Sequence, residues 1–434
     1  MQKKTNQINK VENLIHVIGT DASGPEKLPK YLQELILSTK KIAAPKRILK
    51  IIPQWWSNST KKPLPECIAS DSPSELINWL KKQGDQVIVL ASGDPLWFGI
   101  GRCLVESLPG NRLVFHPSIT SMQLAFARLG IPWQNASWIS LHGRDAAPLA
   151  KRLQERPESL AILTNPTNEG AKEVRQYLHA SGLEESYALW ICEQLGHPQE
   201  RIQRVMPKDE LAPDLHPLHI VILLEEKPSP PTPESLPLFG IEDGIFLQHD
   251  DSPGLMTKRE IRVQLIADLE LPKEGVLWDI GAGVGSIGLE ALRLRPKLKL
   301  LAIEKRIGAS SLIQANAKRL FVQPAAVIES EALKVITNRE IPEDLCNPQR
   351  VVLGGGGIHR EKLLEVVLKL LPKGGIVLIP FVTLEAMSEL TRTLKDSSCE
   401  LTISQHQSWR GVPLASGTRL SPTNPVFILK GKVL

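Results

Sequence analysis

The stretch that most constrains the fold is VLWDIGAGVGSIG, residues 276–288. An apolar run and one acidic residue are followed by glycines at 281, 283 and 285 and then by a helix-compatible continuation. This order predicts a buried strand, a tight turn and a helix. The glycines lack the Cβ atoms that would keep a ligand off the backbone, and they tolerate positive φ. We therefore expect an α/β domain with a nucleotide-like cofactor at the turn.

Two classes of cofactor use such a turn. Gly283, Gly285 and Gly288 also fit the G-x-G-x-x-G pattern of dinucleotide-binding domains. Asp279 favours S-adenosylmethionine, because a pyrophosphate would meet a like charge there, whereas an ammonium and a sulfonium would meet an opposite one. Glu304, at the end of the next predicted strand, is placed to accept both ribose hydroxyls in either class.

Two other classes of function stay open on these residues. The first is an NAD-dependent oxidoreductase that uses the glycine turn at 281–288, with the N-terminal half of the chain as its substrate domain. The second is a non-enzymatic binding module whose cofactor clefts have degenerated. Asp279 argues against the first, since a pyrophosphate site would not be expected to carry that acid.

A proline-rich stretch divides the chain. At 434 residues the protein is too long for one compact core. Residues 226–240 carry five prolines, which fix φ and remove hydrogen-bond donors, so this stretch is expected to be a semi-rigid linker. We predict an N-terminal domain over 11–225, a linker over 226–240 and a C-terminal domain over 241–434.

Both halves show alternating strand and helix patterns, which indicate an α/β class. In the N-terminal half, a strand is expected near 46–52, helices from Lys30 and Ser74, and a strand buried on both faces at 87–90. This half is expected to form two sublobes. In the C-terminal half, an apolar stripe at helical spacing predicts a helix within 258–269, and the last strands are expected to close as an antiparallel hairpin.

Composition excludes several classes. No stretch is long and apolar enough to span a bilayer, and the first 19 residues lack an apolar signal core, so we expect a cytoplasmic protein. The net charge of +5 comes without a long basic tract and does not demand nucleic acid. The cysteines are scattered without ligand spacing, which argues against a metal site; they are Cys67, Cys103, Cys192, Cys346 and Cys399.

Taken together, these strings resemble the bifunctional, decarboxylating precorrin C-5,15-methyltransferases of corrin biosynthesis. GLMTKREIR, VLWDIGAGVGSIGLEA, AIEK and the glycines after VVL resemble the C-15 methylase and decarboxylase module of that family. LASGDPLWFGIGR, PSITSMQLAFARLG and SLHGRD resemble its C-5 module, a tetrapyrrole methylase. The resemblance implies a two-lobed tetrapyrrole methylase-like domain followed by a Rossmann-like S-adenosylmethionine methyltransferase domain.

The resemblance also implies an activity. Two molecules of S-adenosylmethionine, at two separate sites, would methylate C-5 and C-15 of precorrin-6B or its cobalt form. The ring C acetate would be decarboxylated to give precorrin-8 for cobalamin (vitamin B12) synthesis. Family modules tend to self-associate, so a homo-oligomer is expected, with a small-molecule tetrapyrrole substrate and no membrane or nucleic-acid partner. A methyltransferase active only in its C-terminal module is a further alternative.

Candidate site residues follow from motif and resemblance together. The cofactor-binding set of the C-terminal site is Thr257, Asp279, Gly281, Ala282, Gly283, Val284, Gly285, Glu304, Glu331 and Ala332. We expect Glu331 to reach the adenine amine, Thr257 to cap its helix or touch the cofactor, and Gly354 and Gly355 to open toward the substrate. The set of the N-terminal site is Gly93, Asp94, Pro95, Ser118, Ser121 and His142, with Leu141 to Gly143 along the cleft.

Methyl transfer needs mainly alignment and desolvation, because the sulfonium is already an activated donor. We therefore expect no single catalytic residue; weak candidates are His142 as a proton carrier and Lys258, Arg259 and Arg262. Basic side chains suit the substrate's acetate and propionate groups, and a solvated helix face explains these charges equally well. Arg102 and Arg144 are the corresponding candidates in the N-terminal half.

Three positions depart from the family pattern. The first loop reads GTDASGP, without the regular glycines of tetrapyrrole methylases, which weakens Gly19 and Gly24 as cofactor contacts. Glu331 stands where an aspartate is usual, and its side chain is one methylene longer. Arg350 stands where an acid is usual, before the fourth strand of the C-terminal half.

Overall fold

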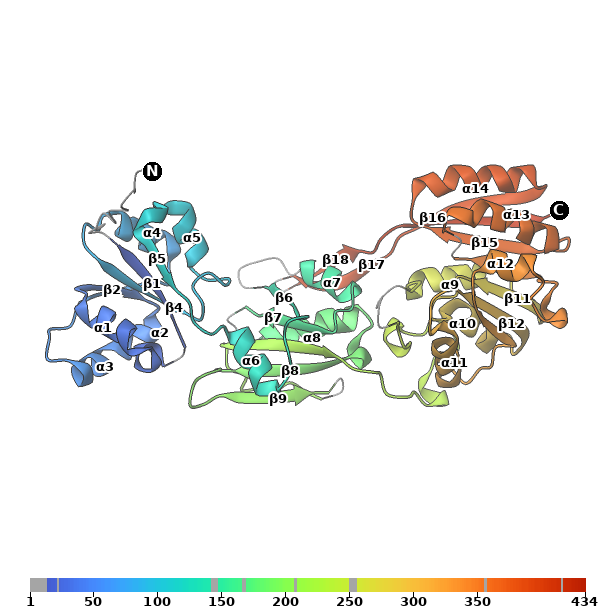
Figure 1. Ribbon diagram of the computed structural model, residues 1–434. Helices are drawn as coiled ribbons and strands as arrows, with labels where there is room; N and C mark the ends of the chain where they lie inside the picture. The colour runs from blue at the N-terminus through green and yellow to red at the C-terminus, as the bar shows by residue number, and fades with distance from the viewer. Residues whose placement is uncertain are drawn as a thin grey trace, which may run out of the picture.

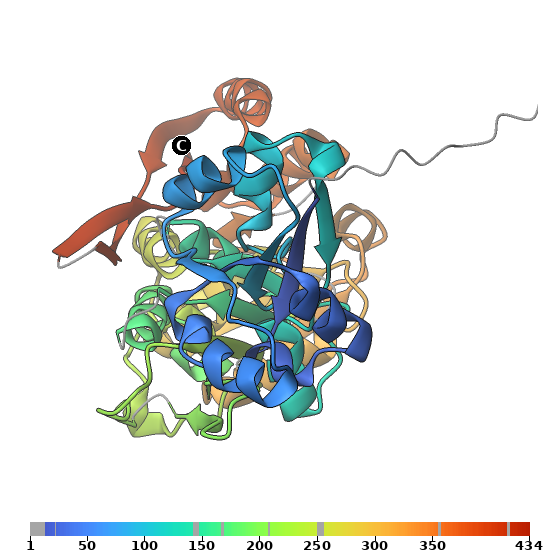
Figure 2. The ribbon, with the colours of Figure 1, turned by 90° about the vertical axis from the view of Figure 1, so that its left-hand side faces the viewer.

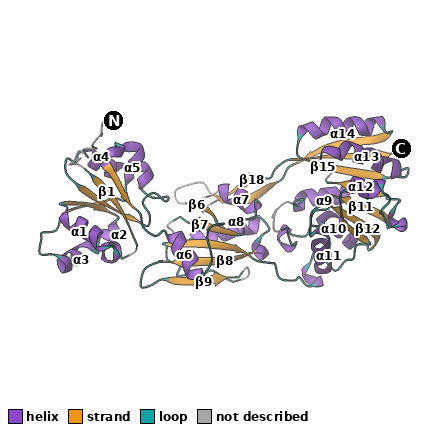
Figure 3. Cartoon of the chain, viewed as in Figure 1, coloured by secondary structure: helices purple, strands orange, loops and turns teal. Residues whose placement is uncertain are grey.

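The computed structural model describes residues 14–21, 23–141, 147–165, 169–206, 209–249, 256–354, 357–414 and 417–434. Three large sheets form three lobes that follow one another along the molecule (Figure 1). Helices alternate with strands in all three lobes (Figure 3). The α/β class expected from the sequence is confirmed.

The first lobe is a five-stranded parallel sheet with the order β3-β2-β4-β1-β5. Separate apolar clusters cover its two faces, one formed with α1, α2 and α3 and the other with α4 and α5. Its elements are β1 (Ile15–Thr20), α1 (Lys30–Ser38), β2 (Lys41–Ala44), α2 (Lys46–Leu49), α3 (Ile52–Ser59), β3 (Glu66–Ala69), α4 (Pro73–Lys81), β4 (Val87–Ser92), α5 (Gly101–Ser107) and β5 (Leu113–His116).

One element of this lobe was expected wrongly. Residues 46–52 are not a strand: they cover α2 and the start of α3, and the strand lies earlier, at Lys41–Ala44. Ile48, Ile52 and Trp56 recur every fourth residue and lie in one buried cluster, which is helical spacing. Pro45 stands directly before α2, where its missing N–H does not weaken a helix.

The second lobe is a mixed sheet with the order β6-β7-β10-β8-β9, in which only β6 and β7 are parallel among these described strands. Helices α6 and α8 pack against β10. The elements are α6 (Ser121–Leu129), β6 (Ser137–Ser140), α7 (Ala147–Gln154), β7 (Ser159–Leu163), α8 (Gly170–Ala180), β8 (Tyr187–Glu193), β9 (Arg201–Val205) and β10 (His219–Glu225).

The third lobe is a seven-stranded sheet with the order β13-β12-β11-β14-β15-β19-β16, in which β19 runs antiparallel to both neighbours. One core cluster includes α9, α10 and α11, and a second, on the other face, includes α12, α13 and α14. The strand order reverses at β11, so the crevice at its carboxyl end is where a ligand binds in such sheets.

The bounds of the third lobe's elements are α9 (Arg259–Asp268), β11 (Glu274–Ile280), α10 (Ser286–Leu294), β12 (Lys297–Glu304), α11 (Ala309–Arg319), β13 (Ala326–Glu329), α12 (Ala332–Thr337), β14 (Arg350–Leu353), α13 (Arg360–Leu370), β15 (Ile376–Phe381), α14 (Leu384–Asp396), β16 (Cys399–His406) and β19 (Val426–Val433). The closing hairpin expected from the sequence differs in detail. Strands β15 and β19 do pair antiparallel, but a helix and three strands separate them along the chain.

Two of those intervening strands form a separate hairpin, β17 (Trp409–Leu414) and β18 (Gly417–Pro422). It reaches back from the third lobe to the second, where β17 packs against α8 (Figure 1). Viewed from the end of the first lobe, the hairpin stands out to one side (Figure 2). Val412, 2% exposed, belongs to the apolar core of the second lobe, so a segment of the C-terminal half completes a core of the N-terminal half.

Candidate active site

The glycine turn after β11 is held by the neighbouring strand. The amides of Gly281 and Ala282 donate to the carbonyl of Ile303, at 2.8 and 3.2 Å. Gly281, Gly283 and Gly285 have φ of 70°, 58° and 81°, a region that side-chain-bearing residues rarely adopt. The turn therefore requires glycine, and it delivers the chain into α10, whose N-cap position is Gly285.

Gly288 sets how closely α10 approaches the sheet. A Cβ at this position would lie 2.7 Å from a methyl group of Leu300 and 3.0 Å from Oδ2 of Asp279. Its amide donates to the same Oδ2 at 3.0 Å. The missing side chain thus allows the first turn of the helix to bind the acid that ends the strand.

Asp279 is 2% exposed and lines the cavity described below. Burial raises the pKa of its carboxyl to about 7, the bond from Gly288 acts in the opposite direction, and the charge of Glu304 adds to the rise. A cation entering beside Asp279 would favour the ionised form. The site is therefore matched to a positively charged ligand group.

Glu304 ends β12, beside the glycine turn. Its Oε2 accepts the Gly283 amide at 2.8 Å, and its Oε1 accepts the amides of Lys305 and Arg306 at 2.9 and 3.2 Å. These bonds fix the carboxylate, which is 8% exposed, at the cavity wall. A carboxylate has about four acceptor positions, so about one remains for a ligand hydroxyl.

A cavity of about 1020 Å³ opens in front of this turn. Its walls come from three parts of the chain: the third lobe, the hairpin through Arg410, and the second lobe through Arg156 and Ser181. The predicted residues that line it are Thr257, Lys258, Asp279, Gly281, Ala282, Gly283, Val284, Glu304, Glu331, Ala332 and Gly354. The structure thus brings together residues that are spread over nearly a hundred positions of sequence.

Two roles expected at this site are not seen. The N-cap position of α9 is Lys258, not Thr257, and no side chain caps the helix. The Thr257 carbonyl instead accepts a bond from Arg262 Nη1 at 2.7 Å. Gly285 does not line the cavity in the described part of the chain; it shapes the turn. Gly355 lies outside the described residues.

Arg262 was a candidate for binding a carboxylate of the substrate, and the structure contradicts this role. The residue is fully buried; its Nε donates to Glu290 at 2.6 Å and its Nη1 to Asp243 at 2.9 Å. A further bond goes to the carbonyl of Ile241. Position 262 shares the buried stripe of α9 with Leu265 and Ile266, so the guanidinium ties α9 to its neighbours and does not face a ligand.

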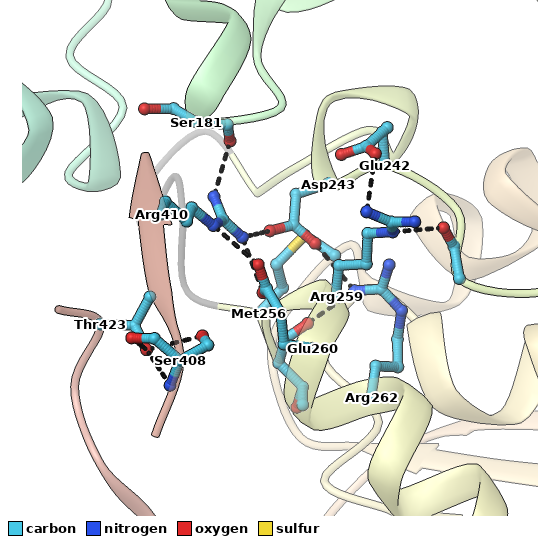
Figure 4. A network of polar contacts seen from close by, with 12 residues as sticks. Ser181, Glu242, Asp243, Met256, Arg259, Glu260, Arg262, Ser408, Arg410 and Thr423 are labelled. Atoms are coloured by element: carbon cyan, nitrogen blue, oxygen red, sulfur yellow. Dashed lines mark hydrogen bonds and ion pairs between the residues drawn. The ribbon is translucent and has the colours of Figure 1, made fainter. Parts of the chain in front are cut away.

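Arg259 is also engaged. Its Nε donates to the carbonyl of Gly240 at 2.7 Å and its Nη1 lies 3.2 Å from Glu242, as Figure 4 shows. Neither Arg259 nor Arg262 is among the residues that line the cavity. Of the three basic candidates at the start of α9, Lys258 is the one that lines the cavity.

Arg410, which the sequence did not single out, lies at the centre of the network in Figure 4. Its Nε and Nη2 each donate to the Glu260 carboxylate at 2.8 Å, and its Nη1 donates to the Ser181 carbonyl at 3.0 Å. Nη2 also lies 3.5 Å from Asp243. Arg410 therefore links three parts of the chain: the second lobe through Ser181, the segment before α9 through Asp243, and α9 itself through Glu260. No local pattern marks position 410, because its partners are distant in sequence.

The N-terminal candidates gather at the carboxyl ends of three neighbouring strands, β4, β1 and β5. A Cβ on Gly19 would lie 2.5 Å from the carbonyl oxygen of Gly93 and 2.6 Å from Cβ of Ser118, so glycine is required at 19 for these loops to meet. Asp94 accepts the Leu96 amide at 2.8 Å and so shapes the turn. None of these residues lines the cavity of the C-terminal half.

The remaining N-terminal candidates are placed as follows. Pro95 is buried, and its carbonyl accepts the Gly101 amide at 2.8 Å, which closes the loop on α5. Ser121 is the first residue of α6, which Thr120 caps. Arg102 is paired with Glu106 at 2.9 Å on an exposed face. His142 and Arg144 lie outside the described residues.

Two negative findings concern the described residues only. They contain no group of three or more His, Cys, Asp or Glu side chains placed to hold a metal ion. None of their helices has the length and apolar character needed to cross a bilayer.

Comparison with known proteins follows the two halves of the chain. Residues 14–209 match the family model of tetrapyrrole (corrin/porphyrin) methylases, and residues 247–431 match the model of the precorrin methyltransferase domain. A precorrin-6Y C(5,15)-methyltransferase (decarboxylating) of Sinorhizobium sp is 29% identical over 374 residues, which are 83% of this chain and 86% of the relative.

Two further similarities involve shorter proteins. A probable cobalt-precorrin-6B C(15)-methyltransferase (decarboxylating) of Pyrobaculum aerophilum is 33% identical over 192 residues, which are 44% of this chain and 94% of the relative. The solved structure of a precorrin-6Y C5,15-methyltransferase of Geobacter metallireducens GS-15 is 26% identical; it covers 46% of this chain and 100% of its own, with a TM-score of 0.41.

Proposed function

Because this chain belongs to the decarboxylating precorrin-6Y C(5,15)-methyltransferases, we propose that it methylates C-5 and C-15 of a precorrin and removes carbon dioxide from the ring C acetate. It is an S-adenosylmethionine-dependent C-methyltransferase of cobalamin biosynthesis. The substrate is precorrin-6B or its cobalt form, and the product is precorrin-8. The oxidoreductase alternative is set aside, because both halves match methyltransferase families.

One observation carries the assignment of the C-terminal half: the buried Asp279, the glycine turn and Glu304 face a single cavity of about 1020 Å³. We assign the methionine part of the cofactor to the turn, its ammonium to the neighbourhood of Asp279, and its ribose diol to Glu304. Glu331 is exposed at the start of α12 on the cavity wall, which suits a contact with the adenine amine.

The cavity is large enough to hold more than the cofactor. Ligand sites in proteins commonly have volumes of about 300–1000 Å³, so this one is at the upper end of that range. We propose that the precorrin enters from the side of the second lobe and the hairpin. The sulfonium supplies an activated methyl group; the residues of this chain hold donor and acceptor in line and exclude water.

Decarboxylation needs a sink for the electron pair that the departing carbon dioxide leaves behind. The conjugated macrocycle of the substrate takes up this pair, and a proton restores neutrality. The protein's part is to hold the acetate in a desolvated position next to the macrocycle. We therefore assign no electron-accepting role to a residue of this chain.

For the N-terminal half we propose a second cofactor site, at the convergence of the loops after β1, β4 and β5. Gly93, Asp94 and Ser118 stand there, and the close fit at Gly19 supports a loop arrangement built for a ligand at strand ends. The division at 226–240, the homo-oligomeric state and the cytoplasmic location stay predictions.

The test is conversion of the substrate. The purified full chain is incubated with precorrin-6B and methyl-labelled S-adenosylmethionine, and the product is analysed by mass spectrometry and NMR. The proposal requires two labelled methyl groups gained and one carbon dioxide lost. A product with one methyl group and carbon dioxide lost would limit the activity to the C-terminal half. No labelled product would refute the proposal.

A further inference from the structure

Arg156 belongs to the second lobe, in the turn between α7 and β7, yet it lines the cavity in front of the glycine turn. The residue is 2% exposed. Its Nη2 lies 3.6 Å from the Glu225 carboxylate. Its Nε and Nη1 make no hydrogen bond of good geometry within the described part of the chain, although the Tyr187 hydroxyl lies close to the guanidinium. Arg156 thus borders the cavity as a permanent cation with two donors buried in the cavity wall.

A buried guanidinium with unsatisfied donors lowers the stability of the protein when no ligand is bound. A guanidinium remains protonated in proteins, so it cannot escape burial by losing its proton. Buried polar groups are nearly always hydrogen-bonded, and an exception calls for an explanation. The backbone of Arg156 adds to the cost, because its φ of 48° is uncommon for a residue with a side chain. Strain of this kind concentrates at ligand clamps.

Two other cations, Arg410 and Lys258, also line this cavity and differ from Arg156 in their partners. Arg410 already donates to Glu260 and to the Ser181 carbonyl. Lys258 lines the same cavity; burial lowers the pKa of its ammonium, and the charges of Arg410 and Arg156 contribute to this lowering, against Asp243. An anion in the cavity would offset the mutual repulsion of Lys258, Arg156 and Arg410.

We propose that Arg156 is a substrate-binding residue that the N-terminal half contributes to the C-terminal site, where its guanidinium pairs with a carboxylate of the tetrapyrrole. The proposal rests on the function proposed above, since a precorrin carries several acetate and propionate groups. It makes the second lobe part of the C-terminal site and not only a neighbouring domain. Arginine suits this task because charge-assisted bonds to carboxylates are the stronger ones.

The experiment compares three full-length proteins: the parent, Arg156→Met and the control Arg152→Met. Arg152 lies on α7 and pairs with Glu155 at the surface, at 2.6 Å. For Arg156→Met we expect the KM for precorrin-6B to rise roughly tenfold to a hundredfold, as for the loss of one charged hydrogen bond. The Kd for S-adenosylhomocysteine should not change, because Arg156 lies outside the cofactor's proposed contacts.

Thermal unfolding separates binding from structure. Burial lowers the pKa of the Arg156 guanidinium more than Glu225, Tyr187 and Asp243 raise it. The Tm of Arg156→Met should therefore equal or exceed that of the parent, whereas a purely structural arginine would give a lower Tm. The control should match the parent in KM and Tm. An unchanged KM in Arg156→Met would overturn the inference, whatever its Tm.

A binding measurement distinguishes this inference from the proposed function. Uroporphyrin III, a stable tetrapyrrole with eight carboxyl groups, is titrated into the same three proteins and followed by its own fluorescence. Binding roughly tenfold weaker in Arg156→Met than in the other two supports the inference even if no protein turns over precorrin-6B. Turnover by the parent with equal KM and equal uroporphyrin binding in all three sinks the inference and leaves the function standing.

Discussion

Protonation of Asp279 should compete with the cofactor. The pKa of this buried carboxyl is raised to about 7, with burial as the main cause and Glu304 as a second. Below that pH the group is largely neutral, so the ammonium of the cofactor loses its counter-charge. Above it, the carboxylate is present before the ligand arrives. Affinity should therefore rise as the pH rises toward 7 and then level off.

The size of the effect follows from the pKa. If the bound ligand holds Asp279 ionised, the apparent Kd at about pH 6 is roughly tenfold that at about pH 8, since each pH unit below the pKa changes the ratio tenfold. About one proton should be released at pH 6, and almost none at pH 8, for each cofactor that binds at the C-terminal site. Isothermal titration of S-adenosylhomocysteine in buffers of different ionisation enthalpy measures both quantities.

The control is Asp279→Asn, which keeps an oxygen for the Gly288 amide and removes the titration. His359 also lines the cavity, so the variant shows whether Asp279 is the group responsible for the pH dependence. The reasoning fails if affinity in the parent is flat between pH 6 and pH 8. It also fails if the affinity of Asp279→Asn for S-adenosylhomocysteine depends on pH as strongly as that of the parent.

Three further changes test the packing around the site. Arg262→Met leaves the buried Glu290 carboxylate without its cation and Asp243 with only the more distant Arg410, and should lower the free energy of unfolding of the third lobe by about 3–5 kcal/mol in urea melts; a loss below about 1 kcal/mol would contradict the network. Gly288→Ala forces the contacts at 2.7 and 3.0 Å and should destabilise by about 1–3 kcal/mol. Val412→Ala removes two methyl groups from the second-lobe core and should cost about 1.6 kcal/mol there, so an unaffected second lobe would mean that the hairpin does not dock.

The local part of the site was predictable from sequence because its signal is local. The strand, the three glycines and the next strand's acid stand in fixed order, and sheet geometry then brings Asp279, the turn and Glu304 to one edge. The α/β class followed from the same alternation of strand and helix patterns. The requirement for glycine at positive φ involves only a few consecutive residues, so a short sequence pattern is enough to predict it.

Other features depend on partners far along the chain. Arg410 meets Glu260, 150 positions away, and Ser181, 229 positions away. The hairpin that carries it, and the reach of Arg156 from the second lobe, follow from how the lobes pack and not from any short pattern. These residues close the cavity, and so the substrate side of the site could not be predicted.

The structure contradicts two predictions, the exposed role of Arg262 and the strand at 46–52, and in both cases the spacing of the residues already indicated the observed structure. Arg262 occupies the apolar stripe of its own helix, one position after Ile261 and three before Leu265, and both of these are buried. An arginine within a buried stripe indicates a buried ion pair more than a ligand fork. Likewise, Ile48, Ile52 and Trp56 have helical spacing, but the short apolar run at 48–52 resembled a strand.

The most direct measurement is the stoichiometry of S-adenosylhomocysteine binding by isothermal titration of the full chain, repeated with Glu304→Ala and with Asp94→Ala. The account predicts two sites per chain in the parent, with the C-terminal site lost in the first variant and the N-terminal site lost in the second. A single site removed only by Glu304→Ala would contradict the second cofactor site. Failure of the parent to bind at all would contradict the account as a whole.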